Sequence, residues 1–105
     1  MSGMFKKTPF NQPVGGWKVS NVRNMSGMFE QTEFFNQPLG KWDVSNVKFI
    51  HAMFDNAKAF NQSITEWTVT TSTEGMFRGA DKMEKANADW YNWTGKKAGR
   101  RWSAR

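Results

Sequence analysis

The residues of this chain that could take part in catalysis are few, and they lie apart in the sequence. The one histidine, His51, stands between Ile50 and Ala52 with no partner motif beside it. Acid–base or nucleophilic catalysis needs its groups within hydrogen-bonding reach of one another. The acids that could serve are scattered: Asp43, Asp55, Glu66, Asp81 and Asp89. The sequence therefore predicts a protein that is not an enzyme and has no catalytic residues.

Metal and phosphate sites are not indicated either. The chain has no cysteine and one histidine, which excludes thiolate and histidine-rich metal sites. No glycine-rich stretch matches a phosphate-binding loop, so we expect no metal and no cofactor. Sequons for N-glycosylation occur at Asn24, Asn61 and Asn92 and matter only in a host that glycosylates.

The most conspicuous polar residues are Asn-Gln pairs, each of which follows a phenylalanine. They could form a recognition stripe for a partner. Alternatively, amides in register could hydrogen-bond turn backbone from one copy of a repeat to the next. We favour the second interpretation, because repetition at a fixed interval serves stacking. The pairs are Asn11-Gln12, Asn36-Gln37 and Asn61-Gln62.

The basic residues gather at one end of the chain. The net charge is +6, and residues 94–105 contain five basic residues and no acid, which leaves +1 for residues 1–93. This tail could contact a polyanion such as nucleic acid, anionic lipid or an acidic protein, with a tryptophan to stack or anchor. A solvated terminus is the alternative. The candidate anchor residues are Lys96, Lys97, Arg100, Arg101 and Trp102.

The elements that would position all these residues belong to one repeat. The words Phe-Asn-Gln and Trp-x-Val recur every 25 residues, with tryptophan at 17, 42 and 67. Residues 1–5, Met-Ser-Gly-Met-Phe, are identical to residues 25–29. Self-similarity at such a period indicates a repeat architecture. We expect repeats over 1–93, with copies at about 1–24, 25–49 and 50–75 and a degenerate copy at 76–93, followed by the basic tail at 94–105.

Within one copy, the apolar spacing predicts a short strand and then a helix. Leu39, Trp42 and Val44 end in alternation, which is typical of a half-buried strand. Ser45 follows at the position of a helix N-cap. The next apolar residues fall on one helical face: Val47, Ile50 and Phe54. Stacked copies would bury these faces, which predicts an α/β repeat fold: a short right-handed solenoid of about three coils, each a short parallel strand plus helix or turn, with an irregular basic tail.

The aromatic and methionine residues are expected to form the core of this stack. The repeated Met-Phe pairs could instead be an adaptable binding surface, but their periodicity favours the core. Trp17, Trp42 and Trp67 would then form a stacked column. They could serve as a carbohydrate platform only if their faces are exposed.

Polar residues that flank the buried tryptophan and valine are the best candidates for partner binding. In an alternating strand they face solvent, and the repeat varies at these positions. They would place Lys18 beside Asp43 and Lys41 beside Glu66, although their role could simply be to keep the surface solvated. We call them the variable row: Lys18, Ser20, Lys41, Asp43, Ser45, Glu66, Thr68 and Thr70.

The repeat resembles a known family. The pattern FNQxLxxWDVSNVxxMxxMF, over roughly residues 1–80, is similar to the BspA-type leucine-rich-repeat surface proteins and to many mycoplasma lipoproteins that share it. The asparagine usual in leucine-rich repeats would fall at Val47, with Asn46 one place early. The resemblance implies a leucine-rich-like solenoid, often extracellular or at a cell surface, that serves adhesion or partner binding and carries no catalytic residues.

The sequence therefore predicts a non-catalytic protein-interaction or adhesion module of a surface or extracellular repeat protein. The alternative is a small structural subunit of a large assembly, such as a virus particle, coat or multi-subunit complex, anchored by the basic tail. Other subunits could stack on an uncapped N-terminal coil. No stretch approaches the roughly 18 apolar residues of a membrane span, so no transmembrane segment is expected.

Overall fold

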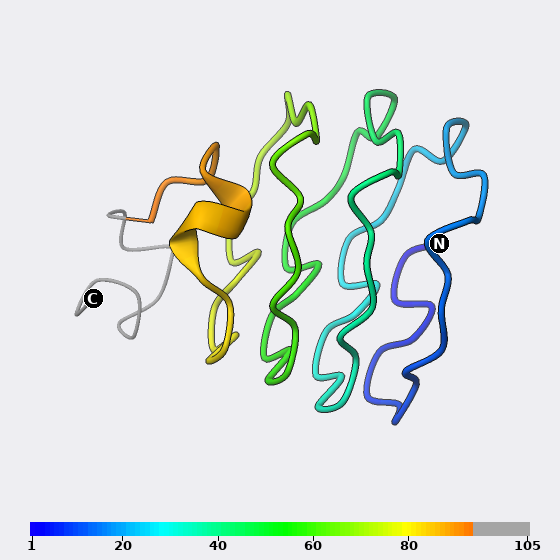
Figure 1. Ribbon diagram of the computed structural model, residues 1–105. Helices are drawn as coiled ribbons and strands as arrows, with labels where there is room; N and C mark the ends of the chain where they lie inside the picture. Colours follow the sequence, from blue (N-terminus) through cyan, green and yellow to red (C-terminus); the bar gives the residue numbers. More distant parts are fainter. Residues whose placement is uncertain (94–105) are drawn as a thin grey trace.

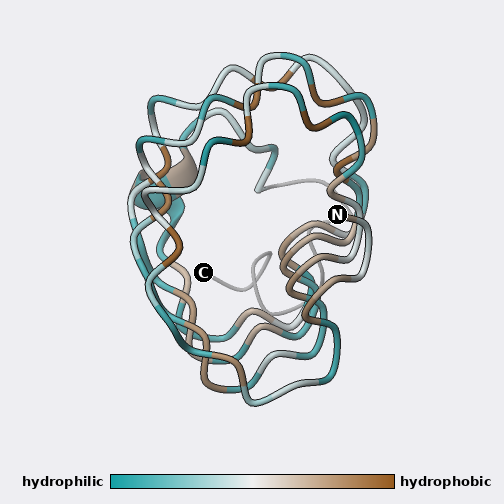
Figure 2. Cartoon of the chain, turned by 90° about the vertical axis from the view of Figure 1, so that its right-hand side faces the viewer, coloured by the Kyte–Doolittle hydropathy of each residue, from teal (hydrophilic) through white to brown (hydrophobic). Residues whose placement is uncertain are grey.

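The computed structural model describes residues 1–93, which wind into coils stacked along one axis (Figure 1). Seen along that axis, the successive coils lie over one another and trace one common outline (Figure 2). In the described residues, the one regular element is the 3₁₀ helix η1, Lys85–Ala88. The single parallel bridge in this part of the chain joins Asn24 and Phe49. Elsewhere in residues 1–93 the coils consist of turns and irregular segments.

The expected α/β solenoid of leucine-rich-repeat type is therefore wrong. Residues 1–93 contain no α-helix and no β-strand, so neither the parallel strand at 39–44 nor the helix after Ser45 is present. The coils are nevertheless held together by backbone hydrogen bonds. Most of these bonds lie in the segment where the sequence predicted a helix, and a further one joins the N–H of Ile64 to the carbonyl oxygen of Asn87 at 2.8 Å.

Residues 25–32 show how this segment joins its neighbour. The N–H groups of Gly27, Phe29 and Gln31 donate to the carbonyl oxygens of the next coil, at 3.1, 2.9 and 2.7 Å. The N–H groups between them close tight turns on the carbonyl three residues earlier, as Glu30 does on Gly27 at 3.1 Å. Alternate residues therefore bond between coils and within a coil. The corresponding residues join the first coil to the second and the third to the fourth.

Backbone conformation explains why this segment is not helical. Gly27 and Gln31 have positive φ values of 63° and 58°. Ala52 and Asn56 repeat this in the next coil at 57° and 59°. A residue with positive φ at the third place of a turn suits a type II turn and ends any right-handed helix. The apolar residues at 47, 50 and 54 are buried as expected. They lie in a run of turns rather than in a helix.

The segment predicted as a strand alternates in burial without pairing as a strand. Trp42 and Val44 are buried, whereas Lys41, Asp43 and Ser45 are exposed. The backbone hydrogen bonds of residues 39–45 close local turns, such as the bond from the N–H of Trp42 to the carbonyl oxygen of Leu39 at 3.1 Å. The alternation therefore predicted correctly which side chains face inward and which face outward. It wrongly predicted that the backbone of this segment pairs with a neighbouring strand.

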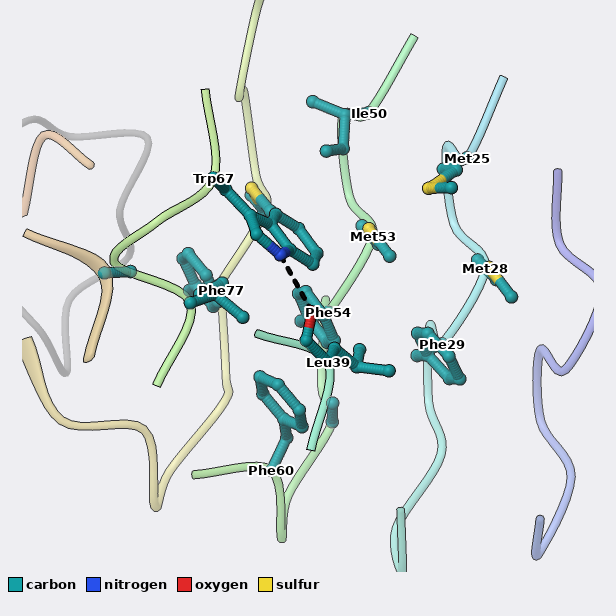
Figure 3. Close-up of a cluster of buried hydrophobic side chains, with 14 of the residues drawn as sticks. Met25, Met28, Phe29, Leu39, Ile50, Met53, Phe54, Phe60, Trp67 and Phe77 are labelled. Carbon is teal, nitrogen blue, oxygen red and sulfur yellow. Dashed lines mark hydrogen bonds between the residues drawn. The ribbon is translucent and has the colours of Figure 1, made fainter. Parts of the chain in front are cut away.

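Phenylalanine rings stacked from coil to coil fill the interior. Phe29 and Phe35 stack at a centroid distance of 4.1 Å, and the matching pair Phe54 and Phe60 at 4.2 Å. Phe29 also stacks on Phe54 in the next coil at 5.6 Å. Figure 3 shows Phe29, Phe54 and Phe60 beside buried methionines of the same coils. The prediction that the Met-Phe pairs form core is confirmed for the second to fourth copies, while Met4 in the first copy is 51% exposed.

Each tryptophan reaches back to the preceding coil. The Nε1 atoms of Trp42 and Trp67 donate to the carbonyl oxygens of Val14 and Leu39, both at 3.0 Å, and the second of these bonds is drawn in Figure 3. Trp90 in the degenerate copy makes the equivalent bond to Ile64 at 2.9 Å. The core assignment of Trp42 and Trp67 is confirmed, and a carbohydrate platform on these two is excluded. Trp17 is 41% exposed.

Candidate interaction surface

All members of the variable row are exposed on the same side of successive coils. Lys18, Asp43 and Thr68 occupy one repeat position, directly after the tryptophan. Ser20, Ser45 and Thr70 occupy the position two residues further on, and Lys41 and Glu66 the one before the tryptophan. The structure thus brings them into neighbouring columns on a surface whose shape is set by the buried residues between them.

The Asn-Gln pairs hold these coils in register. The backbone N–H of Asn36 donates to Oδ1 of Asn11 at 3.0 Å, and that of Asn61 donates to Oδ1 of Asn36 at 2.9 Å. Gln37 and Gln62 donate through Nε2 to the same two asparagine oxygens, both at 3.0 Å. The structural interpretation of these amides is confirmed, because their side chains bond neighbouring coils. Their repetition therefore serves the scaffold that presents the variable row.

The expected ion pairs within the variable row are absent from residues 1–93. Lys18 does not pair with Asp43, nor Lys41 with Glu66. Asp43 is instead bonded locally: its Oδ1 accepts the Ser45 hydroxyl at 2.6 Å and the Ser45 backbone N–H at 3.0 Å. These two bonds, the hydroxyl first, hold the pKa of Asp43 below its ordinary value. Ser45, predicted as a helix N-cap, is thus a donor in an aspartate turn. Lys18 and Lys41 form no ion pair within residues 1–93.

Ser45→Ala should raise the pKa of Asp43 toward the ordinary value of 3.8, because the larger of the two causes is removed. Since the folded pKa lies below the unfolded one, the contact stabilises the fold above the unfolded pKa. That contribution is lost as the pH falls through the folded pKa. A carboxyl NMR titration measures the change. Ser20→Ala is the matched control and should leave the pKa of Asp43 unchanged, because Ser20 follows Lys18 where Ser45 follows Asp43. An equal shift of the Asp43 pKa in both variants would contradict the role of the Ser45 hydroxyl.

One charged column was not anticipated from the sequence. Lys6 pairs with Glu30 at 3.5 Å. Arg78 pairs with Asp55, a residue that is 1% exposed and whose carboxylate also accepts a hydrogen bond from Nδ2 of Asn56 at 2.7 Å. All four charged residues occupy one repeat position, just after the Met-Phe pair. Charges of both signs at one position of a repeat were the signal that could have revealed these contacts between coils. The bond from Arg78 to Asp55 is also the first cause of the raised pKa of Arg78.

Two exposed phenylalanines were also missed. Phe34 is 59% exposed and Phe49 is 54% exposed. Phe34 stands at the repeat position of Pro9 and Ala59, so its departure from the pattern was the available signal.

His51, the possible metal ligands and the basic tail are the remaining candidates from the sequence. His51 is exposed. Among residues 1–93, no group of three or more histidine or acidic side chains is placed to hold a metal ion. No helix in this same part of the chain is long and apolar enough to cross a membrane. The candidate anchor residues of the basic tail, Lys96, Lys97, Arg100, Arg101 and Trp102, lie outside the described residues.

The repeat defines the family of this chain. Residues 1–93 match the model of the mycoplasma proteins of unknown function, DUF285, and the chain belongs to that family. The match spans the stacked coils, including the degenerate fourth copy. Neither the curated proteins nor the solved structures contain a match to this chain.

Proposed function

We propose that this protein is a non-catalytic interaction module that binds a protein partner through the variable row. The observation that carries this proposal is the contrast between scaffold and surface. Most of the residues that repeat are buried or bonded between coils. The row residues are exposed, and those directly beside the tryptophan differ from copy to copy. Lysine, acid and hydroxyl groups side by side would select a partner by complementary charge and hydrogen bonding.

A place at the cell surface is the second part of the proposal. It is supported by the resemblance of the repeat to BspA-type surface proteins and by membership of a family associated with BspA-like mycoplasma repeat proteins. On this proposal the chain serves adhesion or partner binding outside the cell. The variable row then contacts the partner, and the stacked core holds the residues of the row in position.

Site-specific photo-crosslinking in the producing cells tests the row. A photoreactive residue at Lys41 or Thr68 should give one discrete adduct that protease digestion removes. Lys82 is the matched control, because it is also an exposed lysine and lies outside the row. Lys41→Glu should reduce the adduct formed from Thr68 and leave the melting temperature unchanged, whereas Lys82→Glu should affect neither. Equal adducts from Lys82 and Lys41, or none from the row, would contradict the proposal.

A structural subunit of a larger assembly is the second candidate. It is favoured by two aromatic side chains that are exposed to solvent, Phe34 at 59% and Phe49 at 54%. Exposed aromatic side chains suit contact with another subunit. The native mass of the protein in an extract of the producing cells separates the two candidates, since an assembly subunit should be recovered with its partners throughout.

A further inference from the structure

Two neighbouring coils differ by one residue at the corner that follows the Met-Phe pair. These coils, blue and cyan in Figure 1, are joined by backbone hydrogen bonds such as that from Lys7 to Glu30 at 3.0 Å. Thr8 and Thr32 align their corners, because each hydroxyl donates to the carbonyl oxygen three residues earlier, at 2.7 and 2.5 Å. Two residues then follow Thr32 before the core phenylalanine of its coil, whereas one residue follows Thr8. The corner of the second coil is therefore one residue longer.

The longer corner carries an exposed aromatic side chain beside a hollow. Phe34 is 59% exposed, and within residues 1–93 its ring stacks on no other aromatic ring. A hollow of about 420 Å³ lies between the two corners, and small-ligand sites span about 300–1,000 Å³. Both of its walls belong to described coils. We call it the corner hollow, and it is lined by Lys7, Thr8, Pro9, Gln31, Glu33 and Phe34.

Three polar side chains of the corner hollow have no partner in the described part of the chain. Lys7, Gln31 and Glu33 are exposed, and their side chains make no hydrogen bond or ion pair within residues 1–93. The amides of the scaffold, such as that of Gln37, are instead bonded to the neighbouring coil. An ammonium group donates, a carboxylate accepts, and a side-chain amide does both. The hollow therefore offers donors and acceptors beside one exposed aromatic ring.

This combination matches the chemistry of a sugar ring. Each sugar hydroxyl both donates and accepts hydrogen bonds, as the polar groups of the hollow require. A pyranose also has a face of C–H groups, which carry a small positive charge. The face of an aromatic ring is negative, so the two faces attract one another and bury apolar area.

The corner hollow is less suited to other classes of ligand. Its one lysine and one glutamate are opposite in charge, so no field of a single sign favours a polyanion. The backbone N–H groups of Lys7, Thr8, Gln31 and Thr32 all donate within the described structure. An extended peptide therefore finds no row of free donors to pair with along these residues.

We propose that the corner hollow binds one pyranose unit of a glycan. The C–H face of the sugar stacks on Phe34, while its hydroxyl groups donate to Glu33 and accept from Lys7 and Gln31. For one sugar ring held by one aromatic side chain and three polar groups, we expect a dissociation constant of about 1 mM. The corner hollow shares no residue with the variable row, and the inference does not depend on that row.

Saturation-transfer NMR on the 105-residue chain tests the proposal. The probes are methyl β-D-galactopyranoside, methyl β-D-glucopyranoside and methyl α-D-mannopyranoside. At least one of them should receive saturation, most strongly at the ring protons of its C–H face, and should shift the ring resonances of Phe34. Phe34→Ala should weaken binding at least tenfold, whereas Phe34→Tyr should retain it. Glu33→Ala should weaken binding at least fivefold, since a hydrogen bond to a charged acceptor is lost.

Phe49→Ala is the matched control, because Phe49 is also an exposed phenylalanine, at 54%, and does not line the hollow. It should leave pyranoside binding unchanged, as should the row variant Lys41→Glu, which separates this test from that of the variable row. No saturation of any of the three pyranosides, or equal binding by Phe34→Ala and the unchanged chain, would overturn the proposal. A polyproline peptide is the competing probe, since exposed aromatic side chains also bind such segments. Shifts of Phe34 with that peptide and with none of the sugars would assign the hollow to a peptide instead.

Discussion

Replacing Trp42 by alanine should lower the free energy of unfolding by about 3–5 kcal/mol. The indole is 4% exposed, tilts against Phe29 at 6.3 Å, and donates to the Val14 carbonyl at 3.0 Å. Its removal leaves a large cavity between two coils and a carbonyl group without its donor. Because a chain of 105 residues has limited stability, we expect the variant to be largely unfolded at 37 °C. Calorimetric unfolding measures the loss.

Trp17 provides the matched control for this prediction. It occupies the same repeat position, is 41% exposed, and its indole N–H has no acceptor within residues 1–93. Trp17→Ala should cost about 1 kcal/mol, near the average for a single substitution. Trp42→Phe separates the two causes, since it keeps an aromatic ring and should lose about 1–3 kcal/mol, mostly from the unpaired Val14 carbonyl. Similar losses at Trp17 and Trp42 would show that the tryptophans do not join the coils.

Replacing Phe54 by alanine should have an effect of the same size, about 3–5 kcal/mol. Its ring is fully buried and stacks on rings of three coils: Phe29 at 5.6 Å, Phe60 at 4.2 Å and Phe77 at 5.5 Å. The methyl group of alanine would leave the centre of the aromatic column empty. Urea unfolding followed by near-ultraviolet circular dichroism measures the midpoint, and the loss of aromatic packing should also weaken the native signal.

The control for Phe54 is another phenylalanine of the same repeat. Phe34 is 59% exposed, so Phe34→Ala should change the stability by no more than about 0.5 kcal/mol. A Phe54→Ala variant as stable as Phe34→Ala would mean that the column in Figure 3 does not hold the stack together.

Much of this fold could be predicted from the sequence because a repeat applies the same constraint several times. The period of 25 residues fixed which residues stack on which, and the recurring phenylalanines, methionines and tryptophans marked the interior. The role of the Asn-Gln pairs also followed, since amides in register bond neighbouring coils. For the same reason, the exposed positions beside Trp42 and Val44 were recognisable as the candidate site.

The tertiary structure alone decided where the coils join. The spacing of the apolar residues at 47, 50 and 54 suits a helix. A run of turns with a positive φ every four residues buries the same three side chains equally well. Sequence periodicity reports which side chains face inward, not which backbone groups bond. Alanine at 52 and glutamine at 31 take the left-handed conformation because the neighbouring coils supply the hydrogen-bond partners. The sequence by itself therefore determined the period, the core and the exposed row. The hydrogen bonds between coils depend instead on contacts between residues about 25 positions apart.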